Sequence, residues 1–331
     1  DGILAQVTQK ELEELVNRVA NGLQDLGLIK GDLIAIDMPM TLEAVAIYLA
    51  GIKAGLVMVT IADSFSLEEI AMRLKIAKPK LIFTQDVILR RNKQLKLYHK
   101  VKEATDLTCI VIPAGKQSPQ LAGEDLIWKS FLSADTVYQA ISCQPYDPIT
   151  ILFSSGTTGA PKAIPWDHTT PIKAASDGYY HHDIRPGDVV CWPTNLGWMM
   201  GPWLVFATLI NGGTLALYAD APHLEEFGKF VELAKITMLG TVPSLVAQWK
   251  ASGKMEAYDW SSIRCFSSTG ECSNPNDMAY LMQLGGHKPI IEYCGGTEVG
   301  GGYVNGTMVQ PAYPATFTTP ALGTEVVLLD Q

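Results

Sequence analysis

Cysteine is scarce in this chain, and its spacing forms no metal-binding or disulfide framework. The six cysteines stand at positions 109, 143, 191, 265, 272 and 294, and none of them forms a CxxC pair. Zinc sites and secreted disulfide scaffolds need closer and more regular spacing. The adjacent His181 and His182 also lack a carboxylate or cysteine at ligand spacing. We therefore expect reduced thiols and no metal site built from these residues.

Positive charge is scarce as well. The chain has 25 Lys and Arg against 34 Asp and Glu, which gives a net charge of -9. Proteins that bind nucleic acid or anionic membranes usually carry a basic surface, so neither is expected as the main partner. An anionic nucleotide would have to be held by local groups.

Long apolar runs are also missing. No residue between Asp188 and Asp220 is charged, but prolines and glycine pairs interrupt this stretch, and its central run 203–210 is far shorter than the ~20 residues of a membrane span. We expect a buried helix and strand there. The chain starts at Asp1 without a signal peptide and stops in mid-pattern at Gln331, so we expect it to be a piece of a longer protein.

Helix and strand signals alternate along the chain. Thr8 with Glu11, and Ser66 with Glu69, match the capping box that starts a helix. The alternation predicts an α/β fold with two stacked, doubly wound subdomains of mostly parallel sheet, residues 1–146 and 147–331, with 113–146 as a linker. Strands are expected at 33–37, 56–61, 81–84, 109–112, 149–153, 189–192, 214–218, 237–240, 264–267, 289–292 and 325–329, and further helices at 43–54, 202–210, 224–234, 243–250 and 276–284.

The segment 154–162 carries a phosphate-binding pattern. Two glycines permit a tight turn that presents backbone N–H groups, four hydroxyls add donors, and a lysine adds positive charge. Its spacing is not the Walker pattern, in which four residues separate the glycines. The expected phosphate-binding residues are Ser154, Ser155, Gly156, Thr157, Thr158, Gly159 and Lys162.

This segment resembles the phosphate loop of the adenylate-forming superfamily, which includes acyl-CoA synthetases, peptide-synthetase adenylation domains and luciferases. Residues 293–298, Tyr-Cys-Gly-Gly-Thr-Glu, are similar to the aromatic-Gly-x-Thr-Glu motif of that superfamily. The resemblance covers essentially the whole chain as the large N-terminal part and points to the acetyl-CoA-synthetase-like clade. The chain looks like a plant peroxisomal acyl-activating enzyme, which implies a peroxisomal location, with the cytoplasm as the alternative.

The resemblance implies three catalytic residues: Lys162, Thr297 and Glu298. The Thr297 hydroxyl suits a phosphate, and the Glu298 carboxylate suits Mg²⁺ on ATP. One position departs from the motif, because the aromatic that stacks on adenine is replaced by Cys294, and Tyr293 stands one residue too early. Either a local bulge lets the Tyr293 ring stack on adenine, or Cys294 makes a smaller and weaker contact with it.

The segment 268–272 is similar to the Gly-Glu-Pro segment that borders adenine in the same clade, with Cys272 in place of proline. The resemblance therefore places adenine beside two strand ends. The expected adenine-binding residues are Gly270, Glu271, Cys272, Glu292, Tyr293, Cys294, Gly295, Gly296 and Thr297.

The segment 192–201 looks like the family's Gly-Trp acyl-pocket segment. Gly295 stands where acetate-specific members have a tryptophan that closes the pocket, so a medium-chain or aryl-alkyl acid is expected in preference to acetate. The expected acyl-pocket residues are Trp198, Met199, Met200, Gly270 and Gly295. Arg90 and Lys93 keep the spacing of two basic residues that bind CoA phosphate in this clade.

The resemblance implies an ATP-dependent acyl-CoA synthetase. A carboxylic acid would attack the α-phosphorus of MgATP to give acyl-AMP and pyrophosphate, and the CoA sulfur would then form the thioester. The catalytic lysine and hinge that family members carry in a small C-terminal domain do not occur before Gln331. The alternatives are a carrier-protein-loading adenylation domain, a luciferase-like oxygenase, and a non-catalytic nucleotide-binding or scaffold protein.

Overall fold

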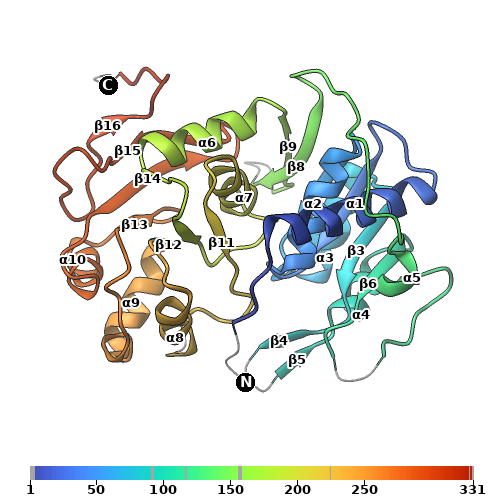
Figure 1. Cartoon of the computed structure of the whole chain (residues 1–331), viewed down its shortest axis with the longest axis horizontal. Helices are drawn as coiled ribbons and strands as arrows, with labels where there is room; N and C mark the ends of the chain where they lie inside the picture. Colours follow the sequence, from blue (N-terminus) through green and yellow to red (C-terminus); the bar gives the residue numbers. More distant parts are fainter. Residues whose placement is uncertain are drawn as a thin grey trace. The chain divides into compact units, whose positions relative to one another are not determined.

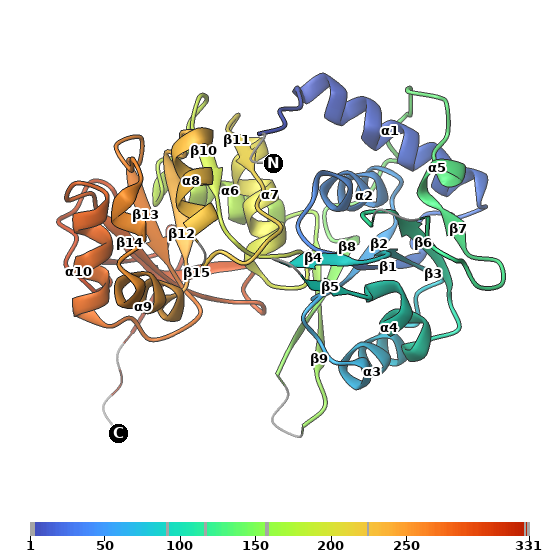
Figure 2. The same ribbon diagram turned by 90° about the horizontal axis from the view of Figure 1, so that it is seen from below.

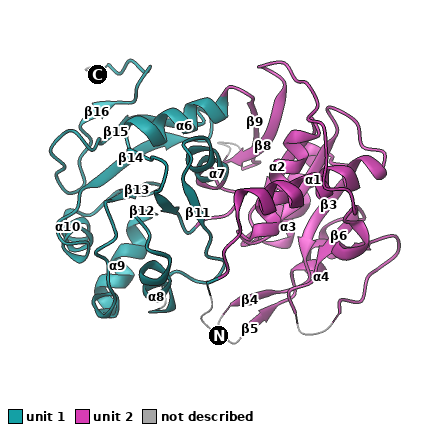
Figure 3. Ribbon diagram, in the orientation of Figure 1, with its two compact units in different colours: residues 1–4, 170–193, 202–331 teal, residues 5–169, 194–201 magenta. Residues whose placement is uncertain are grey.

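The computed structural model describes residues 4–90, 93–115, 118–155, 159–223, 225–327 and 329, and it divides into two compact units (Figure 3). The N-unit consists of residues 5–169 and 194–201, and the C-unit consists of residues 170–193 and 202 onward, together with Leu4. This division differs from the expected boundary at residues 146 and 147. Strand β8 (Pro148–Ser154) pairs in parallel with β2 (Val57–Ile61), and this pairing makes β8 part of the N-unit.

The N-unit is built on a seven-stranded sheet in the order β7-β6-β3-β1-β2-β8-β9. All its neighbouring strands run parallel except β8 and β9, which are antiparallel. A separate hairpin consists of β4 (Ile88–Arg90) and β5 (Lys93–Leu95). The remaining strands of the sheet are β1 (Leu33–Asp37), β3 (Leu81–Gln85), β6 (Thr108–Ile112), β7 (Leu126–Ile127) and β9 (Lys162–Asp167).

Helices cover both faces of this sheet (Figure 2). Helices α1 (Gln9–Asp25) and α2 (Leu42–Lys53) lie on one face, and α3 (Leu67–Ala77) and α4 (Leu97–Ala104) lie on the other, where they enclose an apolar cluster. Both expected capping boxes are confirmed at the starts of α1 and α3. In the expected linker, the described residues form only β7 and the short helix α5 (Trp128–Phe131), so this stretch is mostly irregular, as predicted.

The C-unit contains a second seven-stranded sheet, in the order β11-β10-β12-β13-β14-β15-β16. Its first five strands are parallel, and the last two are antiparallel. Its strands are β10 (Val189–Cys191), β11 (Thr214–Ala216), β12 (Met238–Thr241), β13 (Cys265–Ser268), β14 (Ile290–Gly296), β15 (Gly301–Asn305) and β16 (Thr319–Pro320).

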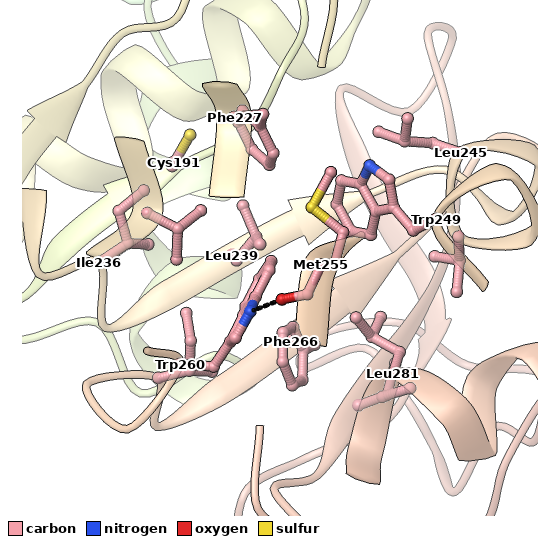
Figure 4. Close-up of a cluster of buried hydrophobic side chains, with 14 of the residues drawn as sticks. Cys191, Phe227, Ile236, Leu239, Leu245, Trp249, Met255, Trp260, Phe266 and Leu281 are labelled. Atoms are coloured by element: carbon pink, nitrogen blue, oxygen red, sulfur yellow. Dashed lines mark hydrogen bonds between the residues drawn. The ribbon is translucent and has the colours of Figure 1, made fainter. Parts of the chain in front are cut away.

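Helices also cover both faces of the second sheet (Figure 1). Helices α6 (Thr170–Tyr180) and α7 (Met200–Ile210) lie on one face. Helices α8 (Glu225–Ala234), α9 (Pro243–Ser252) and α10 (Pro275–Leu284) cover the other. Figure 4 shows the apolar cluster beneath these three helices, in which the Trp260 indole also donates a hydrogen bond of 2.8 Å to the Met255 carbonyl.

The α/β class and mostly parallel sheets are confirmed, and a few elements differ from expectation. The elements that were not expected include helices α4 and α6 and strands β4, β5, β9, β15 and β16. The strand expected at 325–329 is wrong, because its described residues form no strand. No helix in the described part of the chain is long and apolar enough to cross a bilayer.

Candidate functional site

The expected phosphate segment is the connection of the β8–β9 hairpin. Ser154 ends β8, Lys162 begins β9, and the two residues face each other in antiparallel register. Gly159 has a φ of 88°, a conformation that favours glycine. The segment therefore joins two antiparallel strands, unlike a Walker loop, which leads into a helix. Gly156, Thr157 and Thr158 lie outside the described residues.

Thr297 and Glu298 lie in the turn between β14 and β15. Residues 297–300 form this turn, and the N–H groups of Val299 and Gly300 each donate to the Gly296 carbonyl at 3.1 Å. Glu298 is exposed and Thr297 is partly exposed. Among the residues that the structure describes, no group of three or more His, Cys, Asp or Glu could hold a metal ion. A magnesium ion at Glu298 would thus depend on oxygens of the nucleotide and water, which is the usual way that proteins hold MgATP.

Tyr293 lies in the interior of the C-unit. Its side chain is only 1% exposed, its ring packs edge-on to His182 with centroids 5.2 Å apart, and its hydroxyl donates to Asp177 at 2.6 Å. A bulge does interrupt the β14–β15 pairing between Cys294 and Gly295. It leaves the Tyr293 ring buried, so stacking of this ring on adenine is not compatible with the packing. The next residue, Cys294, is partly exposed.

Gly295 is required by the backbone around it. A Cβ at this position would collide with the carbonyl oxygen of Gly301 on β15. The neighbouring Gly296 is different, because a Cβ there would lie 3.7 Å from the Glu298 carboxylate, which is ordinary contact. The close approach of β14 and β15 therefore accounts for Gly295 by itself, independently of an open acyl pocket.

The loop after β13 lies beside the end of β14. The Thr269 hydroxyl donates to the Tyr293 carbonyl and joins the two strand ends. Gly270 has a φ of 90°, which favours glycine. Glu271 accepts hydrogen bonds from the Ser244 N–H at 2.8 Å and the Ser244 hydroxyl at 2.9 Å, so its carboxylate is bound to the start of α9.

Glu292 is a buried carboxylic acid at the same strand end. It is 4% exposed and accepts a 2.8 Å hydrogen bond from the Ser273 hydroxyl. Burial raises the pKa of the Glu292 carboxyl above its ordinary value, and the Ser273 hydrogen bond partly offsets this. Cys272, in the loop after β13, is exposed.

In the N-unit, Arg90 and the segment 194–201 share one buried carboxylate. Asp63 is 5% exposed, pairs with the Arg90 guanidinium at 3.1 Å and accepts from the Asn195 amide at 2.6 Å. Gly197 approaches the backbone of Ala62 so closely that a Cβ would collide with it. Arg90 therefore helps to fix the segment 194–201 through Asp63. Lys93, on β5, is exposed.

The three expected acyl-pocket side chains of this segment differ in exposure. Trp198 is 49% exposed and packs edge-on to Phe65 with centroids 5.4 Å apart. Met199 is partly buried, and Met200 is buried at the start of α7. The segment thus presents an exposed aromatic next to flexible apolar side chains.

Sequence reasoning missed Asp177, which organises the β14–β15 hairpin. This fully buried carboxylate on α6 accepts from Lys173, from the Tyr293 hydroxyl and from the Gly302 N–H at 2.9 Å. Its neighbour His182 is also fully buried and is bound to the Ser267 hydroxyl at 2.9 Å. The Lys-x-x-x-Asp spacing of residues 173 and 177 is the signal that would have indicated a helical ion pair.

The fold is α/β with mostly parallel sheets, and the two segments that resemble adenylate-forming enzymes, residues 154–162 and 293–298, follow the strands β8 and β14. The sequence model described as AMP-binding enzyme matches residues 4–331, and the chain belongs to this family.

The chain is similar to plant and bacterial proteins that are named acyl-activating enzymes or CoA synthetases. The chain is 49% identical over 335 residues to "Hexanoyl-CoA synthase" of Cannabis sativa, covering 99% of this chain and 46% of that protein. It is also 49% identical over 332 residues to "Probable acyl-activating enzyme 17, peroxisomal" of Arabidopsis thaliana, covering 98% and 46%. The solved acetoacetyl-CoA synthetase from Streptomyces lividans has a TM-score of 0.87 at 28% identity, covering 97% of this chain and 52% of that one. The chain spans about half the length of these relatives.

Proposed function

We propose that this chain is the ATP-binding and acid-binding part of an acyl-CoA synthetase, which activates a carboxylic acid as acyl-AMP and transfers it to CoA. The observation that carries the proposal is the family match over residues 4–331, together with the relatives named as CoA synthetases. Residues 154–162 supply hydroxyls and a lysine for the phosphates. Residues 293–298 supply a hydroxyl for a phosphate and a carboxylate for a metal ion.

In this proposal the charged groups act on the developing charge of the phosphates. Lys162, exposed at the start of β9, balances the β- and γ-phosphates. Thr297 donates to the α-phosphate, and Glu298 would hold the Mg²⁺, which would supply positive charge to the phosphates. The backbone at Gly270 and at residues 294–296 borders adenine.

For the acid, we propose a medium-chain or aryl-alkyl carboxylate. The support is the 49% identity to a protein named hexanoyl-CoA synthase and the adaptable side chains of Trp198, Met199 and Met200. The absence of a side chain at Gly295 adds less support than the sequence indicated, because the hairpin backbone requires glycine there. We also propose a peroxisomal location, on the names of the plant relatives.

The test is ATP–pyrophosphate exchange by the full-length enzyme across a panel of acids from acetate to decanoate and phenylpropanoate. We expect Lys162→Ala and Glu298→Ala each to lower the exchange rate by ~10²-fold or more, because removing a group that stabilises transition-state charge typically costs a few kcal/mol. Lys129→Ala and Glu124→Ala, which change exposed residues on the N-unit, are the matched controls. Exchange at the unmodified rate in both site variants would refute this phosphate site, and a carrier protein replacing CoA as the better acceptor would refute the CoA step.

A further inference from the structure

Cys294 occupies the position at which the family motif has an aromatic residue, and a tyrosine from the neighbouring strand lies against it. The Cys294 thiol donates to the Tyr303 hydroxyl, with 3.1 Å between Sγ and Oη. Tyr303 lies on β15, nine residues further along the chain. An aromatic ring is therefore present beside Cys294, but it belongs to the neighbouring strand β15 and not to β14.

The bulge in the β14–β15 hairpin explains how Tyr303 comes to lie there. Cys294 pairs with Val304, and Gly295 pairs with Gly302, so Tyr303 is the extra residue of the bulged strand. A bulge redirects the side chain of its extra residue and is common next to binding sites. The hydrogen bond with Cys294 places Tyr303 on the face of the hairpin opposite the buried Tyr293. A Cβ on Gly302 would meet the Tyr293 ring, so the face of residue 302 is the buried face and the adjacent Tyr303 points away from it.

Tyr293 and Tyr303, the two tyrosines of this hairpin, differ in solvent exposure. Tyr293 is 1% exposed, whereas Tyr303 is 38% exposed. The interaction with Cys294 raises the pKa of Tyr303 above its ordinary value. A tyrosine phenol is neutral at physiological pH in any case. A neutral, half-exposed ring that is fixed at its hydroxyl end offers a flat apolar surface at low entropic cost.

We propose that Tyr303 provides the aromatic surface on which the adenine base of the nucleotide stacks, with the Cys294 thiol fixing its ring. The inference rests on the proposed function, because it assumes that adenine binds beside Cys294. It makes Tyr303 a binding residue that the family motif does not contain, and it gives Cys294 a role as a support.

The experiment measures AMP binding by calorimetry and the KM for ATP in pyrophosphate exchange, with the full-length enzyme. We expect Tyr303→Ala to weaken AMP binding and to raise the KM for ATP by about tenfold, since stacking on an aromatic side chain contributes on this scale. Tyr303→Phe should stay within about twofold, because the ring remains. Cys294→Tyr should restore most of the lost affinity in the Tyr303→Ala background, where space for a second ring has been created.

Two controls separate stacking from a structural effect. Tyr303→Leu fills the same space without an aromatic face and should lose affinity like the alanine variant, while Tyr146→Ala removes an 81% exposed tyrosine of the N-unit and should lose none. Affinity of the leucine variant within about twofold of the unmodified enzyme would overturn the inference, even if the alanine variant fails to fold. Absence of pyrophosphate exchange with every acid, combined with AMP binding that still depends on Tyr303, would overturn the proposed function and leave this inference standing.

Discussion

At the scale of single residues, Gly295 shows how one missing side chain can have two explanations. By comparison with acetate-specific relatives, its lack of an indole indicates a larger acyl pocket. The structure adds a local cause, because the Gly301 carbonyl occupies the place of a Cβ. Gly295→Trp would therefore disturb the hairpin before it could fill a pocket, and it is not a clean test of chain-length preference.

The pair Gly295 and Gly296 gives a direct measurement of this constraint. We expect Gly295→Ala to lower the free energy of unfolding by ~1–3 kcal/mol, because the methyl group forces the two strands apart. Gly296→Ala, whose methyl group would make only ordinary contact with the Glu298 carboxylate, should change it by less than ~0.5 kcal/mol. Chemical denaturation of the two variants provides the comparison, and equal effects would show that the β14–β15 approach does not fix residue 295.

The sequence predicted which positions along the chain form the candidate site better than it predicted the contacts of their side chains. The positions of Thr297 and Glu298 at a strand end follow from the alternation of apolar and polar residues, and the structure places them in a turn there. The sequence did not predict which of these side chains form hydrogen bonds with other residues of the protein. The hydrogen bonds of Tyr293 to Asp177 and of Glu271 to Ser244 join residues 116 and 27 positions apart. Such pairings depend on tertiary packing, which no local pattern records.

At the scale of elements, the predictable strands were the buried parallel ones. Strands such as β3 and β6 are short apolar runs with clear boundaries. Helix α6 was missed because it contains Pro171, Gly178 and two adjacent tyrosines, all of which weaken a helical pattern. Strand β15 was missed because it opens with two glycines, and its pairing partner β14 fixes it.

The β4–β5 hairpin allows the two expected CoA residues to be distinguished. We expect Arg90→Ala to raise the KM for CoA and also to lower the melting temperature, because it leaves the buried Asp63 without its cation. Lys93→Ala should raise the KM for CoA without affecting the melting temperature, since Lys93 is exposed. Thermal melting and CoA kinetics of the full-length variants test this. Loss of stability in Lys93→Ala, or none in Arg90→Ala, would contradict the assignment.

At the scale of the whole molecule, buried ionisable groups set the pH dependence of stability. Burial lowers the pKa of His182 from its ordinary value of 6.5 to about 4. The unfolded chain therefore binds a proton at this histidine that the folded chain excludes, and stability is complete above pH 6.5 and falls as the pH drops toward 4. Glu292 acts in the opposite direction, because its raised pKa favours the folded state at low pH.

We expect His182 to reduce the free energy of unfolding by ~2 kcal/mol between pH 7.5 and pH 5. His182→Gln, which cannot be protonated, should be less stable at pH 7.5 but should show a correspondingly flatter acid limb. Urea unfolding of both proteins at several pH values measures the difference in slope. Parallel pH profiles would show that His182 is not the titrating group.

The insertion of residues 194–201 into the N-unit has a consequence for synthesis on the ribosome. Asn195 reaches back to Asp63, and Gly197 packs on the end of β2, so the N-unit is incomplete until this segment has been made. By then the growing chain has already delivered residues 170–193, which belong to the C-unit, including α6 and β10. The N-unit therefore cannot be completed before part of the C-unit has been synthesised. Residues 170–193 therefore lack the rest of the C-unit during the time in which the N-unit is completed.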